Sequence, residues 1–295
     1  MANLKEIRTR IASVASTRQI TAAMKMVAAA KLKKAQDAVT NLKPYALKMH
    51  DITMNVASAS DGKNIYSDER DLRQVLIVVI TSNKGLCGAF NSNAIKEALL
   101  LAEKKYSSEL ESDKIRFMAI GKKGYDMLRK RKLPIAKFDT NIVEKPTYEN
   151  VSEIAQSLLD TFTTGIYDCI DIVYNEFVNA ATQKVLNKQF LPLLPPEEKN
   201  RERAMKAKQI DYIFEPDKEY IINELIPQSL RLMLYEALLD SIASEYGARM
   251  TSMHQATDNA TTLIQDLTLQ YNKARQAAIT NEILEIVGGA EALKG

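Results

Sequence analysis

One stretch of this sequence has the residue types of a phosphate-binding turn. TSNKGLCGAFN, residues 81–91, follows an apolar run and precedes an amphipathic helical pattern, which is where such a turn would lie. Its glycines, Gly85 and Gly88, are spaced G-x-x-G, whereas nucleotide sites need G-x-G-x-x-G or G-x-x-x-x-G-K-[ST]. Lys84 also precedes the glycines, although a P-loop lysine must follow them. We interpret the segment as a tight strand-to-helix turn, with nucleotide binding as the alternative.

The other side chains that could do chemistry are few and scattered. They are two cysteines, two histidines and two carboxylate pairs: Cys87, Cys169, His50, His254, Glu197–Glu198, and Glu282 with Glu285. Two isolated cysteines in strand-like segments are typical of reduced core residues, and two distant histidines do not make a zinc site. The carboxylate pairs have no histidine, serine or cysteine beside them in a catalytic pattern. We therefore expect no catalytic residue, no metal and no cofactor.

Positive charge is concentrated near the beginning of the chain. The net charge is +3, but residues 1–50 carry ten Lys or Arg against Glu6 and Asp37. The cluster KLKK, residues 31–34, is open to three interpretations: a solvated face, a contact with an acidic protein, or a nonspecific nucleic-acid footprint. Because the surrounding segment lacks aromatic residues for base stacking, nucleic acid is the least favoured of the three.

These residues lie in a chain whose two ends both have helical patterns. Residues 1–43 contain no glycine or proline and would form a helix about 65 Å long. A heptad seam begins at Leu4 and resumes at Ala28, but between them its phase falls on polar residues. There the apolar stripe moves to Ile20, Ala23, Met24 and Val27. We expect a seam that is interrupted midway, with Pro44 kinking or ending the run.

The C-terminal end has a matching pattern. Residues 248–287 lack glycine and proline, and Pro227 and Gly247 are expected to interrupt the helix before them. The predicted seam comprises Arg249, Met253, Ala256, Ala260, Leu263, Leu267, Ala274, Ala277 and Leu284. Antiparallel pairing of the terminal helices would bury both seams.

Between the ends, strand and helix patterns alternate. The expected strands are 73–82, 115–121, 134–138, 168–178 and 183–193, of which the last two could pair with each other, and helices are expected at 92–110, 122–131 and 149–165. We predict an α/β fold class: a long antiparallel coiled coil of the N- and C-terminal helices plus a small Rossmann-like α/β domain with a mostly parallel sheet.

The predicted organisation has four parts: a coiled-coil helix at 1–60, the α/β domain at 70–195, a charged linker at 196–210, and a strand with the C-terminal coiled-coil helix at 211–295. The longest apolar run, residues 76–80, is too short to span a membrane, and the N-terminus lacks the features of a secretory signal. We expect a soluble, cytoplasmic protein.

Several segments together resemble the gamma subunit of F-type ATP synthase, the central rotor stalk. They are ITNEILEIVGGAEA (279–292), ARMTSMHQATDNA (248–260), YNKARQAAI (271–279), KEIRTRIASV (5–14), ITAAMKMVAAAK (20–31) and TSNKGLCGAFN. The resemblance covers essentially the whole chain, and in this family the last segment is not a nucleotide site. It implies a subunit without bond chemistry or cofactor, which transmits torque between ion flow and ATP synthesis or hydrolysis.

The resemblance also implies partners. The terminal helices would form a shaft inside a six-subunit head of alpha and beta subunits, while the α/β domain and lower shaft would sit on the membrane rotor ring of c subunits. An epsilon subunit is a further partner, nucleic acid is not, and one copy serves each complex. Met24, Arg249 and Gln276 match the shaft's contacts with the catalytic subunits, and Glu215, in IFEPD, matches the foot that meets the ring.

The implied location is peripheral, at the cytoplasmic face of a bacterial inner membrane, because no transit peptide is recognised. No segment matches the redox-regulatory cysteine insertion of chloroplast members. Two other hypotheses are a dinucleotide-binding enzyme and a basic coiled-coil scaffold for nucleic acid. Cofactor binding, salt-sensitive DNA binding and co-purification with an ATPase head would distinguish the three.

Overall fold

The computed structural model describes residues 4–58, 65–68, 70–107, 109, 113–193 and 218–292, apart from the side chains of 50, 54–58, 218–222 and 292. The chain divides into two compact units. Unit 1 combines Met1–Ala29 with Arg249–Gly295, and unit 2 is Ala30–Ala248. The charged linker expected at 196–210, and the strand expected to follow it, lie outside the described residues.

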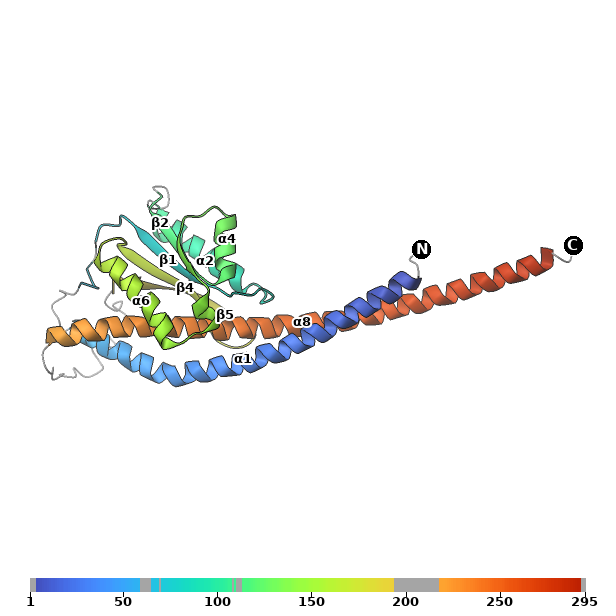
Figure 1. Ribbon diagram of the computed structural model, residues 1–295, viewed down its shortest axis with the longest axis horizontal. Coiled ribbons are helices and arrows are strands. Elements are labelled where there is room, and N and C mark those ends of the chain that lie inside the picture. Colours follow the sequence, from blue (N-terminus) through green and yellow to red (C-terminus); the bar gives the residue numbers. More distant parts are fainter. Residues whose placement is uncertain are drawn as a thin grey trace. The chain divides into compact units, whose positions relative to one another are not determined.

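Each terminal segment forms one continuous helix. Helix α1 spans Leu4–Ser58 and α8 spans Lys218–Ala292 (Figure 1). Pro44 was expected to kink or end its helix and Pro227 to interrupt the other; both prolines lie inside these helices, so the ending and the interruption are wrong. A proline releases the carbonyl four residues earlier, which belongs here to Thr40 and Asn223. Both of these residues are exposed, so water can bind the released carbonyls.

Gly247 does not interrupt α8 either. A Cβ atom at this position would lie 3.3 Å from the ring of Phe177 and from the Cα atom of Ala180. Glycine therefore serves close packing at this point of the helix, at the modest cost in helix propensity that a single glycine imposes. The sequence pattern could not separate this use of glycine from a helix end.

Unit 2 is built on a five-stranded sheet with the order β3-β2-β1-β4-β5. Its strands are β1 (Val75–Ile80), β2 (Ile115–Ile120), β3 (Ile135–Asp139), β4 (Cys169–Phe177) and β5 (Gln183–Leu191). The first four strands are parallel, and β5 pairs antiparallel with β4. The predicted mostly parallel sheet and the predicted pairing of the last two strands are confirmed.

Helices cover both faces of this sheet, which explains why every residue of β1 is buried. Helices α2 (Phe90–Lys105) and α4 (Lys122–Lys130) pack on the face that includes Val75, Ile77 and Val79. The strand order reverses after β3, so a right-handed crossover puts α6 (Tyr148–Thr163) on the opposite face. A short helix, α5 (Asn141–Glu144), which the sequence patterns did not predict, precedes α6.

Within unit 2, α8 is tied to both α6 and the sheet. The guanidinium group of Arg231 donates a hydrogen bond to the side-chain oxygen of Gln156 on α6. The Ser244 hydroxyl donates to the backbone carbonyl of Asn175 on β4, at 3.0 Å. These bonds join the first part of α8 to the α/β layer.

The cysteines are free and buried, as predicted, although Cys87 lies in the loop after β1 and not in a strand. Cys169 begins β4, and its sulfur lies 3.0 Å from the hydroxyl of Tyr106. That hydroxyl donates to buried Asp171, which also accepts a hydrogen bond from Lys105. Burial, and then the charge of Asp171, raise the pKa of the Cys169 thiol to about 11. The thiol is therefore protonated at neutral pH and chemically inert.

Candidate functional site

In unit 1 the beginning of α1, up to Ala29, pairs antiparallel with the later part of α8. Two polar contacts show the direction. The Arg8 guanidinium donates to the Tyr271 hydroxyl at 2.7 Å, and the hydroxyls of Thr21 and Thr257 lie 2.8 Å apart. Residue numbers rise along α1 as they fall along α8, so the predicted antiparallel pairing is confirmed.

The seam between these helices combines small side chains with a few large ones. Its buried members are Ile7, Thr21 and Ala28 on α1, and Arg249, Met253, Ala260 and Leu267 on α8. Seven residues separate Thr21 from Ala28, so the heptad phase of α1 continues without a shift through its polar stretch. The interruption inferred from the sequence is wrong: polar side chains occupy seam positions there.

Most of the stripe that the sequence predicts here therefore faces outward: Ile20, Ala23 and Val27 are exposed. Ile20, Met26 and Val27 have exposed fractions of 60%, 68% and 57%. Met24, on the same stripe, is half-buried. Met26 lies about 120° around the helix from Ile20 and so on another side. Ile20, Met24 and Val27 are named here the α1 apolar face. Apolar side chains of this size gathered on one stretch of exposed helix indicate a surface that contacts another protein.

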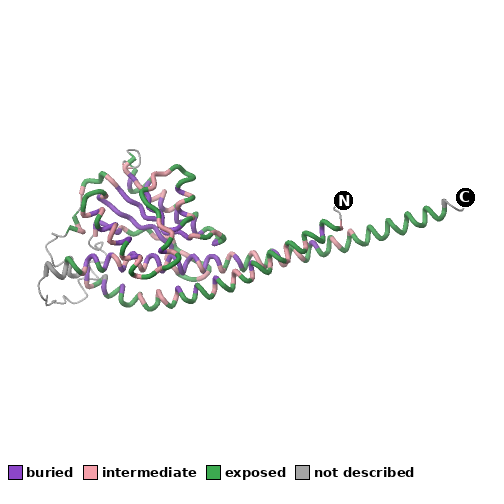
Figure 2. The backbone as a smooth tube through the Cα atoms, viewed as in Figure 1, coloured by how far each residue is buried: buried purple, intermediate pink, exposed green. Residues whose placement is uncertain are grey.

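The last part of α8 presents a second exposed apolar stripe. All residues from 275 to 291 are exposed, and Figure 2 shows this end of the helix as a continuous exposed stretch. Ile279, Ile283 and Ile286 follow the three-and-four spacing that places side chains on one helix face, with Gln276 one turn before them. The same spacing puts Glu285 on another side of the helix, whereas Glu282, three residues after Ile279 and four before Ile286, borders the face. The residues 276, 279, 283, 286 and 287 are named here the α8 stripe.

This arrangement corrects the predicted C-terminal seam. Ala277 and Leu284 are exposed, and the first described residue of α1, Leu4, lies opposite about residue 274 in this register. Leu263 is exposed as well, because it lies on the outer side of the pair while Leu267 faces the seam. The heptad pattern identifies the apolar stripe of α8 but does not indicate how much of that stripe α1 covers.

Charge is divided between the two helices of unit 1. Residues 4–29 carry five basic side chains and one acidic, whereas residues 249–292 carry three basic and five acidic. The beginning of α1 therefore already has a partner of opposite net charge in its own chain.

Lys31, in the KLKK cluster of unit 2, lies with its Nζ 5.4 Å from the ring centre of Tyr246.

The residues carried over from the resemblance do not form one cluster. Arg249 is 8% exposed and lies within the folded chain, while Gln276 is exposed on the α8 stripe. The two are 27 residues apart on one helix, which separates them by about 40 Å. Met24 lies on the α1 apolar face, and Glu215 lies outside the described residues. The sequence analysis missed Met26 and the run from Ile279 to Val287, although three-and-four spacing identifies that run.

The loop between β1 and α2 is a closed turn. The backbone N–H of Ser82 donates to Asn91 Oδ1, that of Thr81 donates to the Ile120 carbonyl, and that of Phe90 donates to the Cys87 carbonyl. A phosphate site needs backbone N–H groups that point at the ligand, and these three are used within the protein. This geometry supports the turn interpretation.

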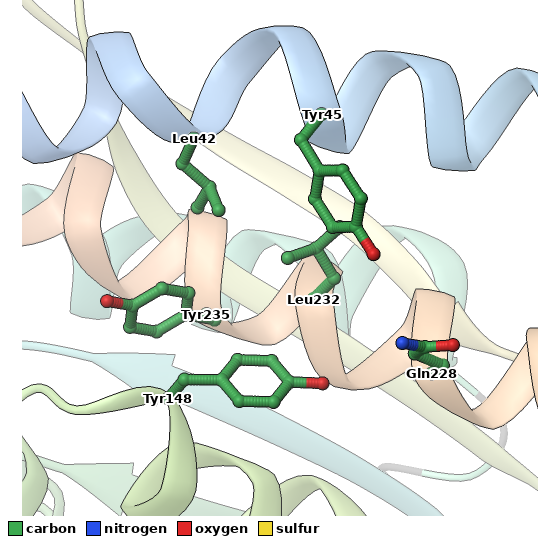
Figure 3. Close-up of a pocket in the computed structure, with 6 residues that line it drawn as sticks. All are labelled: Leu42, Tyr45, Tyr148, Gln228, Leu232 and Tyr235. Carbon is green, nitrogen blue, oxygen red and sulfur yellow. The ribbon is translucent and has the colours of Figure 1, made fainter.

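A partly open cavity of 290 Å³ lies in unit 2 (Figure 3). Its lining comes from α1, α6 and α8: Leu42, Tyr45, Tyr148, Gln228, Leu232 and Tyr235. The rings of Tyr148 and Tyr235 meet edge to face, with centroids 5.7 Å apart. None of the lining side chains is charged, so the cavity suits neither a nucleotide phosphate nor a metal ion.

Over the described ranges, no group of His, Cys, Asp and Glu is arranged to hold a metal ion. The described helices also include none that is long and apolar enough to cross a membrane.

Comparisons with known proteins agree over the whole chain. A family model described as ATP synthase matches residues 3–293. The chain is 54% identical to the ATP synthase gamma chains of Flavobacterium psychrophilum and Flavobacterium johnsoniae, over 100% of each chain. The ATP synthase gamma chain of Halothermothrix orenii is 43% identical, again over 100% of both chains.

Solved structures give the same result for the fold. The central stalk and c-ring of Tetrahymena thermophila mitochondrial ATP synthase includes a chain with a TM-score of 0.58 and 29% identity, covering 80% of this chain and 99% of that one. A chain of the Euglena gracilis mitochondrial ATP synthase rotor has a TM-score of 0.65 and covers 94% and 98%. Its identity is 22%, so this second likeness concerns the fold alone.

Proposed function

The chain belongs to the gamma-chain family of ATP synthase, the central-stalk rotor subunit, and from this premise we propose that unit 1 is the part of the rotor that contacts the catalytic head. The observation that carries the proposal is the outward apolar surface of unit 1. The α1 apolar face and the α8 stripe both expose branched or long apolar side chains. In the assembled complex the alpha and beta subunits of the head would cover them.

Unit 1 is suited to rotation inside a sleeve. Its seam contains alanines and threonines, so the two helices lie close and the pair stays thin. Its outer contacts are single apolar side chains spread along a rod, which can exchange partners as the rod turns. The basic side chains of α1 would attract acidic loops of the catalytic subunits at a distance, and such attraction tolerates sliding.

The proposed coupling mechanism follows from the asymmetry of a single rod inside a symmetric head. One rod within a ring of three equivalent sites presents a different side to each site at any moment, so each site is biased toward a different conformation. Rotation then takes every site through the same series of states. The gamma chain carries out no bond chemistry in this proposal and holds no cofactor. Catalysis stays with the head, and Arg249, Gln276 and Met24 belong to the coupling surface.

Unit 2 would meet the membrane rotor. The Tetrahymena structure, to which this chain is similar, comprises the central stalk together with the c-ring. By that likeness, the α/β layer and the Glu215 segment would contact a ring of c subunits and an epsilon subunit. One copy per complex would lie peripherally, at the cytoplasmic face of a bacterial inner membrane.

A pair of matched variants tests the contact with the head. Ile279→Asp with Ile283→Asp places two charges on the α8 stripe, and Ala278→Asp with Asn281→Asp places two charges on the other side of the same turns. All four positions are exposed, so both variants should melt as the wild type does. We expect the stripe variant alone to lose co-purification with the six-subunit head, or ATP synthesis in the reconstituted complex. Equal behaviour of the two variants would remove the α8 stripe from the contact.

A further inference from the structure

We propose that Thr21 and Thr257, together with Arg8 and Tyr271, set the register of the helix pair in unit 1. All four are positioning residues: they determine which residues of α1 lie opposite which residues of α8. The inference rests on contacts inside unit 1 and does not depend on the proposed function. It goes beyond that function, because a contact surface says nothing about what prevents the two helices from sliding along each other.

The two threonine hydroxyls form a bonded pair in a buried place. Thr21 is 9% exposed, and its Oγ1 lies 2.8 Å from Thr257 Oγ1. Thr21 Oγ1 is also 3.0 Å from the Arg18 carbonyl, and Thr257 Oγ1 is 2.8 Å from the Met253 carbonyl. Two hydroxyls have two protons, so one proton bridges the threonines while the other bonds to a helix carbonyl. Each hydroxyl can donate to its own helix carbonyl in any register, so what the observed register adds is the hydrogen bond between the two hydroxyls inside the seam.

The alanines of the seam have little power to choose a register, although Ile7, Met253 and Leu267 add larger apolar contacts. Ala28 and Ala260 are buried seam members, and Ala256 and Ala274 are half-buried. Contacts between alanines change little when one helix moves along the other by a heptad, because the side chains have no shape to interlock. A polar seam position is the known device for specifying register in coiled coils, at some cost in stability.

The contact between Arg8 and Tyr271 disfavours a register that the threonine pair alone would still allow. If α8 moved by one turn, Thr21 would face Thr261 and keep a hydroxyl partner, but Arg8 would then face Arg275. Movement by a heptad would put Thr21 opposite Ile264 or Met250, which leaves a buried hydroxyl against an apolar side chain. Both contacts are made together only in the observed register.

In a rotor this matters, because within unit 1 torque passes between the two helices through side-chain contacts. Slippage by one heptad displaces one helix by about 10 Å along the other. Such a slip would move the α8 stripe relative to the α1 apolar face. This consequence, unlike the register itself, rests on the proposed function.

Disulfide mapping in the full-length chain tests the proposal. Ile11→Cys is combined with Leu267→Cys for the native register, or with Ala260→Cys or Ala274→Cys for slips of one heptad in either direction. The native cysteines are buried and do not compete. A heptad displacement of about 10 Å exceeds the Cα separation that a disulfide can bridge, so each pair reports one register.

We expect the wild-type background to crosslink only in the native pair. In Thr21→Val with Thr257→Val, the slipped pairs should crosslink at least tenfold more than in the wild-type background, and adding Arg8→Ala should increase this further. The melting temperature should stay the same or rise, since valine replaces both hydroxyls with methyl groups of the same shape. Thr21→Ser with Thr257→Ser should restore native-only crosslinking.

Two results would overturn the proposal. One is native-only crosslinking in the variant that combines Arg8→Ala with both valines. The other is equal slippage in the serine and valine variants, because the hydroxyls would then be irrelevant. Since the crosslinks are measured on the free chain, neither result depends on whether the catalytic head binds unit 1.

Discussion

Leu263 and Leu267 lie one turn apart on α8, yet Leu267 is 7% exposed and Leu263 is 47% exposed. Heptad spacing had placed both in the seam. The antiparallel partner covers only one of them, because each seam position touches a single stripe of α1 and Leu263 lies beyond its edge. The pair therefore provides an internal comparison between a buried and an exposed leucine on the same helix.

Aspartate at these two positions should have very different effects. Leu267→Asp places an unpaired charge in the seam and should lower the free energy of unfolding of unit 1 by about 3 kcal/mol or more. Leu263→Asp should change it by less than about 0.5 kcal/mol, since the charge stays in water. Hydrogen exchange of residues 253–274 measures both. Similar loss of protection in the two variants would contradict the seam.

Substitutions of Arg249 and of Gln276 should differ in how they affect the stability of the chain and ATP synthesis by the complex. Gln276 is exposed on the α8 stripe, so Gln276→Leu should leave the melting temperature unchanged while ATP synthesis by the reconstituted complex falls severalfold. Gln270→Leu, an exposed glutamine on the other side of α8, is the matched control and should preserve synthesis. A normal synthesis rate for Gln276→Leu in an intact complex would exclude this residue from the coupling surface.

Arg249 should behave differently from Gln276, because it is buried and interacts within the chain. Arg249→Ala removes a buried side chain together with its interactions, and should lower the free energy of unfolding by about 1–3 kcal/mol as well as lower coupling. Thermal unfolding of the free chain gives the first quantity, and ATP synthesis by the complex gives the second. An unchanged melting temperature would show that burial of this side chain adds nothing to the fold.

The contact of Arg8 with Tyr271 should hold the beginning of α1 in place. The guanidinium carbon lies 5.6 Å from the ring centre, in addition to the hydrogen bond to the hydroxyl. Tyr271→Phe keeps the ring and should cost less than Tyr271→Ala, which should cost about 0.5–1 kcal/mol because the site is largely exposed. Exchange rates of the amides of residues 5–14 report the loss. Arg10→Ala, whose partner Glu6 is on the same helix, serves as the control.

Unit 2 contains a carboxyl group that makes stability depend on pH. Burial, then the charge of Glu236, raise the pKa of Asp240 to about 6, with Lys43 opposing, Glu176 adding and Lys188 opposing. The folded state therefore binds this proton more tightly than the unfolded chain does. The resulting stabilisation is fully present below the unfolded pKa near 4 and is lost as pH rises through 6.

Asp240→Asn mimics the protonated group and should remove this dependence. At pH 7.5 the variant should be more stable than wild type by about 1–2 kcal/mol, allowing for partial exposure, and at pH 4 the difference should vanish. Denaturant unfolding at the two pH values measures it, with Asp126→Asn, an exposed residue of α4, as the control. Equal differences at both pH values would contradict a raised pKa.

Much of the architecture follows from local patterns. The run VLIVVI in β1 has no polar residue, and only a strand covered on both faces buries six such side chains in a row. The helical spacing around Ala94 and Leu158 likewise specifies helices with one buried face. The spacing of Gly85 and Gly88 was enough to argue against a phosphate site, because the glycine pattern depends on local backbone geometry alone.

The sequence by itself thus determined the strands of the sheet, the long helices and the family resemblance, since these depend on residues that are near in the chain or on shared motifs. Only the tertiary structure decided what each seam residue faces. Thr21 lies inside the pair and Ile20 outside, although hydropathy alone favours the reverse. The reason is that a stripe becomes a seam only where a partner covers it. Pairing of α1 with α8 brings together residues more than 230 positions apart, as Thr21 and Thr257 show. A pattern among neighbouring residues cannot indicate which of these distant residues will face each other.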